Sequence, residues 1–131
     1  MKDDQALLAR VKARVMKAIR EQATSRPANP QVVRLGDAAG WETVAAGIER
    51  KMFWSADEVR SCLVRVAPGT TVPGHLHEVD EECLVLAGSC RIGPDIELRT
   101  GDFHVGRRGT WHGDAYTETG ATLYLRGSPV L

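Results

Sequence analysis

The chain has 131 residues, 43% hydrophobic and 26% charged, which suits one globular domain with a buried core. Its 17 basic residues balance its 17 acidic ones, so neither a nucleic acid nor a membrane surface is expected as a partner. No apolar run approaches the length of a membrane span, and the first residues lack the layout of a signal peptide, so a cytoplasmic location is expected.

Residues 3 to about 22 are predicted to form one amphipathic helix. Leu8, Val11, Val15 and Ile19 recur at helical spacing and mark its apolar stripe. The opposite face carries basic residues: Arg10, Lys12, Arg14 and Lys17. Such a helix either docks on an acidic partner or packs within its own protein with the basic face in solvent, and the sequence leaves both interpretations open.

Prolines and small polar residues over 24–30 then predict a linker. We therefore divide the chain into an N-terminal helix and linker, residues 1–31, and a β-domain, residues 32–131. Strands are expected at 32–35, 41–44, 48–54, 60–66 and 82–87, with further short ones near 89–92, 96–99, 102–106 and 121–126. Many short strands with one helix outside them predict an all-β sandwich or barrel. Gly88 is expected to stop the strand before it.

Three of the four histidines fall in one constellation with a carboxylate. His75 and His77 stand two residues apart, so on a strand both side chains emerge from the same face. Glu81 follows shortly after, and His112 comes beyond a stretch with several glycines. Imidazole and carboxylate groups hold divalent first-row metals while leaving coordination positions open. The sequence therefore predicts a site for one divalent transition metal, which can be zinc, iron, manganese, nickel or copper.

The spacing of these residues resembles the two conserved motifs of the cupin superfamily. The first motif is matched by Gly69, His75, His77, Glu81 and Gly88, separated by five, one, three and six residues. The second is matched by Gly101, Gly109 and His112, with Arg107 at the position that is usually proline. The resemblance covers about residues 32–127. It implies a double-stranded β-helix, or jelly-roll, barrel whose metal is held near one mouth by His75, His77, Glu81 and His112.

Within the superfamily, the stretch from residue 64 to Gly88 is most similar to the cupin domain of ChrR-type anti-sigma factors. Residues 8–15 resemble the segment that joins the two halves of those zinc anti-sigma factors. The half that binds the sigma factor carries its own His/Cys zinc motif, which this sequence lacks. A sigma factor is therefore not expected as a partner.

The residues alone do not decide which carboxylate completes the site. Both parities of the strand after residue 80 are apolar, so alternation does not separate Glu81 from Glu82, and only the family spacing selects Glu81. A hairpin from His77 through residues 78–80 is expected to return Glu81 on the neighbouring strand. His112 is expected from a more distant strand, so metal binding and folding should be coupled.

Several neighbours of the motif have two interpretations. His104 fits no ligand position and is expected to be half-exposed or hydrogen-bonded, with a role toward the substrate as the alternative. Cys83 is expected on the same interior face as Glu81, either as a small buried hydrophobe or as a redox handle. Arg107 and Arg108 either meet an anionic ligand at the barrel mouth or form an exposed basic turn.

Three cysteines that form no CxxC pair, Cys62, Cys83 and Cys90, are expected to be free thiols. Leu76 and Leu84 are expected to face away from the metal, where one of them supports a homodimer interface.

Two functions fit the sequence. One is a binding or sensory module related to the regulatory half of ChrR-type proteins. The other is a metal-dependent oxygenase or isomerase-like enzyme that acts on a small oxygenated substrate. The sequence shows no clear base or nucleophile near the ligands, which favours the first, and it lacks a sigma-binding domain, which favours the second. We therefore assign no catalytic residue and leave enzyme status open.

Overall fold

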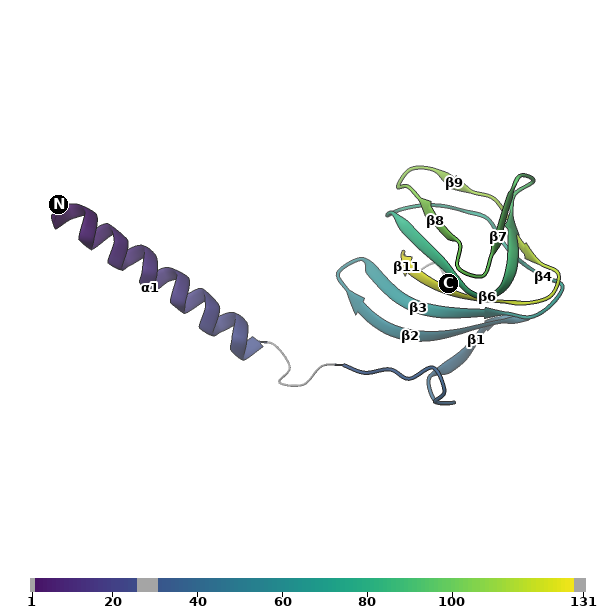
Figure 1. Cartoon of the computed structure of the whole chain (residues 1–131), viewed down its shortest axis with the longest axis horizontal. Helices are drawn as coiled ribbons and strands as arrows, with labels where there is room; N and C mark the ends of the chain where they lie inside the picture. The colour runs from purple at the N-terminus through teal and green to yellow at the C-terminus, as the bar shows by residue number, and fades with distance from the viewer. Residues whose placement is uncertain (1, 26–30, 129–131) are drawn as a thin grey trace. The chain divides into compact units, whose positions relative to one another are not determined.

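The computed structural model describes residues 2–25 and 31–128, and the chain divides into two compact units, Met1–Val33 and Arg34–Leu131. The first unit holds helix α1, Lys2–Ser25 (Figure 1), which confirms the predicted helix and extends it slightly at both ends. The last residues of α1 occupy the start of the expected linker, whose remainder, 26–30, lies outside the described residues. Within the described ranges, no helical segment combines the length and apolarity needed to cross a bilayer.

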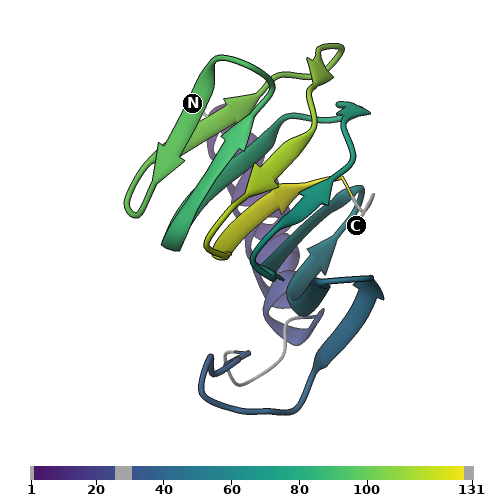
Figure 2. The same cartoon turned by 90° about the vertical axis from the view of Figure 1, so that its right-hand side faces the viewer.

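The second unit is built from many short strands, as predicted, and the pairings between its described strands are antiparallel. Their bounds are β1 Trp41–Ala45, β2 Ile48–Ala56, β3 Val59–Val66, β4 Thr70–Val72, β5 His75–Leu76, β6 Glu81–Ile92, β7 Ile96–Arg99, β8 Phe103–Gly106, β9 Trp111–His112, β10 Ala115–Thr117 and β11 Ala121–Gly127. Over the described residues, nine strands form one sheet in the order β1-β2-β3-β11-β6-β10-β4, with β7 and β8 also paired to β6. Strands β5 and β9 form a second, two-stranded sheet. The large sheet curls strongly on itself (Figures 1 and 2).

Strand β6 explains much of this curl. The sequence predicted two strands interrupted at Gly88, but β6 runs through this residue without a break. Gly88 adopts a φ of 76°, and a Cβ built there would lie 2.0 Å from the carbonyl oxygen of Gly120. The close approach of these two backbone segments therefore requires glycine. The first half of β6 pairs with β11 and β8, whereas the second half pairs with β7 and β10. The strand thereby passes from one part of the curled sheet to the other.

The strand predicted at 32–35 is wrong, because this segment has no ladder partner in the structure. Backbone carbonyls in and just after this segment instead accept hydrogen bonds from a side chain. Lys51 on β2 is only 2% exposed. Its ammonium group donates hydrogen bonds to the carbonyl oxygens of Arg34 and Asp37. A buried lysine thus satisfies the Arg34 carbonyl, which the prediction had assigned to a sheet, and that of Asp37 just after it.

The interior of the second unit holds two clusters of buried apolar side chains. One contains Cys83, Val85, Cys90, Ile92, Leu98, Ala121 and Leu123, and the other contains Ile48, Cys62, Val64, Val66 and Val72. All three cysteines are free and buried, as predicted for the thiols. Burial raises the pKa of each thiol, that of Cys83 to about 12, so these groups stay protonated and pack as small hydrophobes.

Candidate metal centre

The small sheet of β5 and β9 brings two of the predicted ligands face to face. His75 pairs directly with His112, and Leu76 pairs with Trp111. The imidazole rings of His75 and His112 are stacked, with centroids 5.0 Å apart and planes 15° apart. Because side chains alternate along a strand, Leu76 and Trp111 point the other way and are exposed. The expected hairpin from β5 to β6 is therefore wrong, since β5 pairs with β9 instead.

His77 follows β5 and is the most deeply buried of the histidines in the motif, at 3% exposure. Its backbone N–H donates to the carbonyl of Thr110 over 2.9 Å, and its own carbonyl accepts from Gly109 over 2.8 Å. These bonds attach the residue to the loop before β9. The sequence gave no sign of this anchoring, because it uses backbone groups that every residue type carries.

The side chain of His77 is held in one tautomer by the same loop. Its Nδ1 lies 3.1 Å from the carbonyl oxygen of Thr110 and 3.2 Å from the Thr110 hydroxyl, which itself donates to the Arg107 carbonyl over 2.6 Å. Nearby oxygens can only accept at this point, so Nδ1 carries the proton and Nε2 keeps its lone pair. This Nε2 is buried and has no hydrogen-bond partner among the described residues. Such an arrangement is typical of a histidine that ligates a metal through Nε2.

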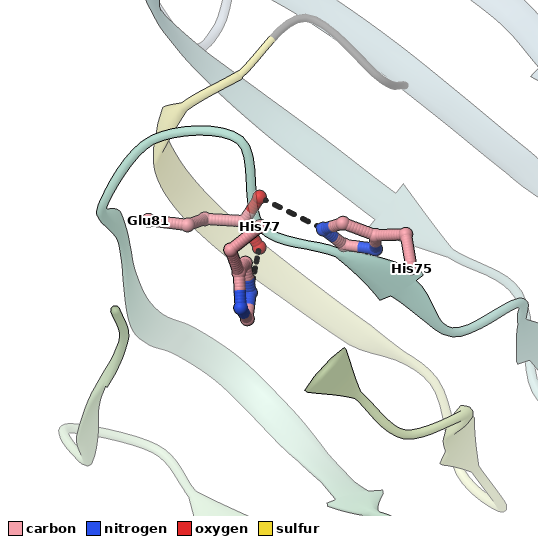
Figure 3. Close-up of side chains that lie close together, drawn as sticks. All are labelled: His75, His77 and Glu81. Carbon is pink, nitrogen blue, oxygen red and sulfur yellow. Dashed lines mark hydrogen bonds and ion pairs between the residues drawn. The ribbon is translucent and has the colours of Figure 1, made fainter. Parts of the chain in front are cut away.

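Glu81, at the start of β6, points its carboxylate at both histidines (Figure 3). Its Oε2 lies 3.2 Å from His75 Nε2, and its Oε1 lies 3.8 Å from His77 Nε2. One ligand atom from each of the three residues lies within 4.8 Å of the others. The neighbouring Glu82 instead faces Arg126, with 3.8 Å between the charged groups. The structure therefore directs Glu81, not Glu82, to the histidines.

His112 stands beside this cluster of three. Its ring centroid lies 5.3 Å from that of His77, and its Nδ1 is buried without a hydrogen-bond partner among the described residues. Burial lowers the pKa of His112; His75 and His77 add to the effect, while the Gly113 backbone and Glu81 oppose it. The neutral imidazole that results is the form that a metal requires.

Two glycines leave room for the side chains of His77 and Glu81. A Cβ built on Gly106 of β8 would lie 2.1 Å from Cε1 and 2.4 Å from Nε2 of His77, so the imidazole ring occupies the space that any other residue would fill. A Cβ on Gly127 of β11 would lie 2.9 Å from Cγ of Glu81. Neither glycine belongs to the motif spacing, and only the folded structure reveals that they form the walls of the site.

A cavity of about 450 Å³ opens beside the histidines, between the β6–β7 turn, β8 and the loop before β9. His77, His112 and His104 line it, together with Arg107 and Asp95. The His104 ring is half-buried and stands edge-on to that of His112, with centroids 6.0 Å apart. The fourth histidine therefore lines the same cavity as His77 and His112.

Comparison with known proteins gives this site its family context. Residues 29–131 match the model of the ChrR cupin-like domain family. The chain belongs to this family. This ChrR cupin-like domain is 30% identical over 99 residues to the pectin degradation protein KdgF of Dickeya dadantii (strain 3937), a match that covers 72% of this chain and 90% of that protein.

Solved structures similar to the ChrR cupin-like domain show the fold. An acetylacetone dioxygenase from Acinetobacter johnsonii matches with a TM-score of 0.69 at 11% identity, covering 79% of this chain and 77% of that one. A chain of the complex between Rhodobacter sphaeroides SigE and the anti-sigma ChrR matches with a TM-score of 0.63 at 19% identity, covering 94% of this chain and 77% of that one. The predicted cupin jelly roll is thus confirmed.

The donor set of the ChrR cupin-like domain suits a divalent transition metal. Two buried imidazole nitrogens, on His77 and His112, lack partners among the described residues, although buried polar atoms are nearly always paired. The carboxylate of Glu81 lies between His75 and His77, where a cation would satisfy all three groups. Nitrogen and oxygen donors of this kind are those that borderline first-row metals prefer.

Proposed function

We propose that this ChrR cupin-like domain binds one divalent transition metal through His75, His77, Glu81 and His112. The observation that carries the proposal is the side chain of His77. Its Nδ1 donates to Thr110, and its buried Nε2 faces Glu81 with no hydrogen-bond partner among the described residues. Leaving a buried nitrogen unpaired costs about 1–3 kcal/mol, which a bound metal would offset.

Zinc, iron, manganese, nickel and copper all accept three imidazoles and one carboxylate. The buried thiol of Cys83, with a pKa raised to about 12, stays protonated and does not compete as a ligand. When bound, such a metal polarises an oxygen atom of a small molecule as a Lewis acid. Because His77 and His112 also line the cavity, a metal held by these residues would border the space that a small molecule can enter.

Metal analysis of the purified protein tests this proposal. We expect about one metal per chain in the wild type, and loss of most affinity in His77→Ala and in His112→Ala. Glu82→Gln is the matched control, because Glu82 is adjacent to Glu81 but faces Arg126. A wild-type protein that takes up no zinc, iron or manganese would overturn the proposal.

Two roles fit a metal site with an adjoining cavity. Membership in the ChrR cupin-like domain family is compatible with the first role, a sensory module related to the regulatory half of ChrR-type proteins. The cavity beside the histidines and the similarity to a pectin degradation protein favour a second candidate, a metal-dependent enzyme that acts on a small oxygenated substrate. The sequence predicts the oxygenase type for such an enzyme.

Turnover separates the two roles. The iron-loaded protein is assayed for oxygen uptake with small diketones, thiols and catechols, with the Glu81→Ala variant as control. Metal-dependent uptake that disappears in this variant supports the enzyme. If the wild type binds metal but consumes no oxygen with any of these compounds, the sensory role is favoured.

A further inference from the structure

We propose that His104 is the polar contact for a small organic anion that binds in the cavity beside the metal residues. The inference rests on the proposed metal site and names the class of ligand that this site takes. His104 itself lies outside the cluster of potential ligands formed by His75, His77 and Glu81.

The position of His104 on β8 directs its ring toward the cavity. Its neighbours Phe103 and Val105 are 57% and 45% exposed, whereas His104 is half-buried and lines the cavity. In the sheet it pairs with the buried Cys83 of β6. Alternation along the strand thus places one imidazole inside and two apolar side chains outside.

The imidazole of His104 is free to bind a ligand. Its ring stands at 86° to that of His112, with centroids 6.0 Å apart, and the structure records no hydrogen bond from it to any described residue. A neutral imidazole carries one N–H donor and one acceptor nitrogen. The N–H of His104 lies next to the proposed metal ligand His112 and has no acceptor among the described residues. It is therefore placed to donate to an oxygen atom of a small molecule in the cavity.

Charge selects the kind of molecule. A divalent cation with the single carboxylate of Glu81 leaves one positive charge in a partly buried site, which is unfavourable unless an anion balances it. Arg107 and Asp95 also line the cavity, and their opposite formal charges sum to zero. One negative charge on the ligand therefore completes the balance.

The remaining lining sets the size and character of the ligand. Ile92, Pro94 and Ile96 supply apolar walls, and the volume of about 450 Å³ is at the small end of the range for ligand pockets. The charge and the walls together favour an organic monoanion with an oxygen-bearing head and a compact apolar body.

The test uses the full chain loaded with cobalt(II), whose visible spectrum reports on its ligands. Benzoate is titrated as the anionic probe, and benzamide as its neutral counterpart of similar shape. We expect the spectral titration to show that benzoate binds at least tenfold more tightly than benzamide. His104→Phe should weaken benzoate binding about tenfold, as expected for loss of a hydrogen bond to a charged group, and leave cobalt affinity within about threefold.

Two further variants make the result specific. His104→Gln keeps an N–H donor and should retain most of the benzoate affinity. Phe103→Ala, on the outward face of the same strand, should change neither cobalt nor benzoate binding.

Other outcomes overturn the proposal in different ways. Equal binding of benzamide and benzoate would contradict the anionic class. A loss of cobalt affinity in both His104→Phe and His104→Gln would mean that His104 only supports His112. A wild type that binds no cobalt would remove the metal site on which the inference rests, whereas one that binds cobalt but not benzoate would refute this inference alone.

Discussion

Lys51 and His77 are both basic side chains buried to 3% exposure or less, and they differ in what surrounds their nitrogens. Lys51 donates to two backbone carbonyls, of Arg34 and Asp37, and its ammonium lies 6.0 Å from the centroid of the Trp41 ring. His77 has one nitrogen hydrogen-bonded to Thr110, whereas the other lies 3.8 Å from Oε1 of Glu81 and has no hydrogen-bond partner among the described residues. The partners of Lys51 all lie within the protein, whereas the Nε2 lone pair of His77 is left for a partner from outside the chain.

This difference separates structural from functional burial. A buried polar group with all its partners inside the protein is explained by folding alone. A buried group oriented by one bond and left open at its other end is more costly to the fold, so it indicates a ligand. Burial by itself, which the two residues share, does not distinguish them.

The largest expected effect concerns Lys51. Lys51→Met removes the donor for two carbonyls and should lower the free energy of unfolding by about 3 kcal/mol. Urea denaturation of the metal-free protein measures this change. Metal content at saturation should stay at the wild-type level, and a variant that keeps its stability but loses its metal would reverse the roles that we assign to Lys51 and His77.

Gly106→Ala tests the metal site, whereas Lys51→Met tests the stability of the fold. The added methyl group would overlap the His77 ring, so the ring must move and metal affinity should fall by about 10–100-fold. Gly36→Ala is the control, because a Cβ there meets no atom within 4 Å. Competition with a chelator measures both affinities. Equal values for the two variants would show that the ring position is not critical.

Acid should destabilise the metal-free protein. Burial lowers the pKa of both His104 and His112 in the folded state, so on acidification the unfolded chain takes up protons first, near pH 6.5. Stability is unaffected by these groups above that pH, falls as the pH drops below it, and levels off below the folded pKa values.

Thermal unfolding between pH 8 and pH 5 measures this trend. His104→Gln should flatten it, and the metal-loaded protein should lose more stability than the metal-free one, because protons also compete with the metal. A melting temperature that rises on acidification would contradict the direction.

The smallest effect is expected at Thr110. Thr110→Val removes a hydroxyl near His77 Nδ1 but keeps the backbone carbonyl that accepts its proton, so metal affinity should fall by less than about threefold. Isothermal titration with zinc measures it. A loss as large as that of Gly106→Ala would show that the hydroxyl, and not the carbonyl, holds the tautomer.

Sequence patterns predicted the helix, most strands of the curled sheet and the group of residues around His75, His77 and Glu81, because these features depend on periodicity and spacing. They did not predict β4 and β10, which have three residues each and therefore too little length for a period. The strand expected at 32–35 has the right residue types, but the carbonyl of its Arg34 is bound by the side chain of Lys51, 17 residues further along the chain.

The walls of the site were also beyond prediction. Thr110 contributes a carbonyl that any residue has, and Gly106 and Gly127 matter only because a ring or a carboxylate lies against them. His104 could be placed near the metal residues only once β8 was seen to pair with the first part of β6.

The place of β11 in the large sheet has a consequence for how the protein is made. This last strand lies between β3 and β6, and its Gly127 lies against Glu81. On the ribosome, β3 and β6 emerge with open edges that only a strand synthesised some thirty residues after β6 can cover. Until then the nascent chain exposes edges prone to wrong pairing, and Glu81 lacks one of its walls. Metal binding at the proposed site is therefore expected only after β11 has been made, and a chain truncated before residue 121 would neither close its sheet nor complete this site.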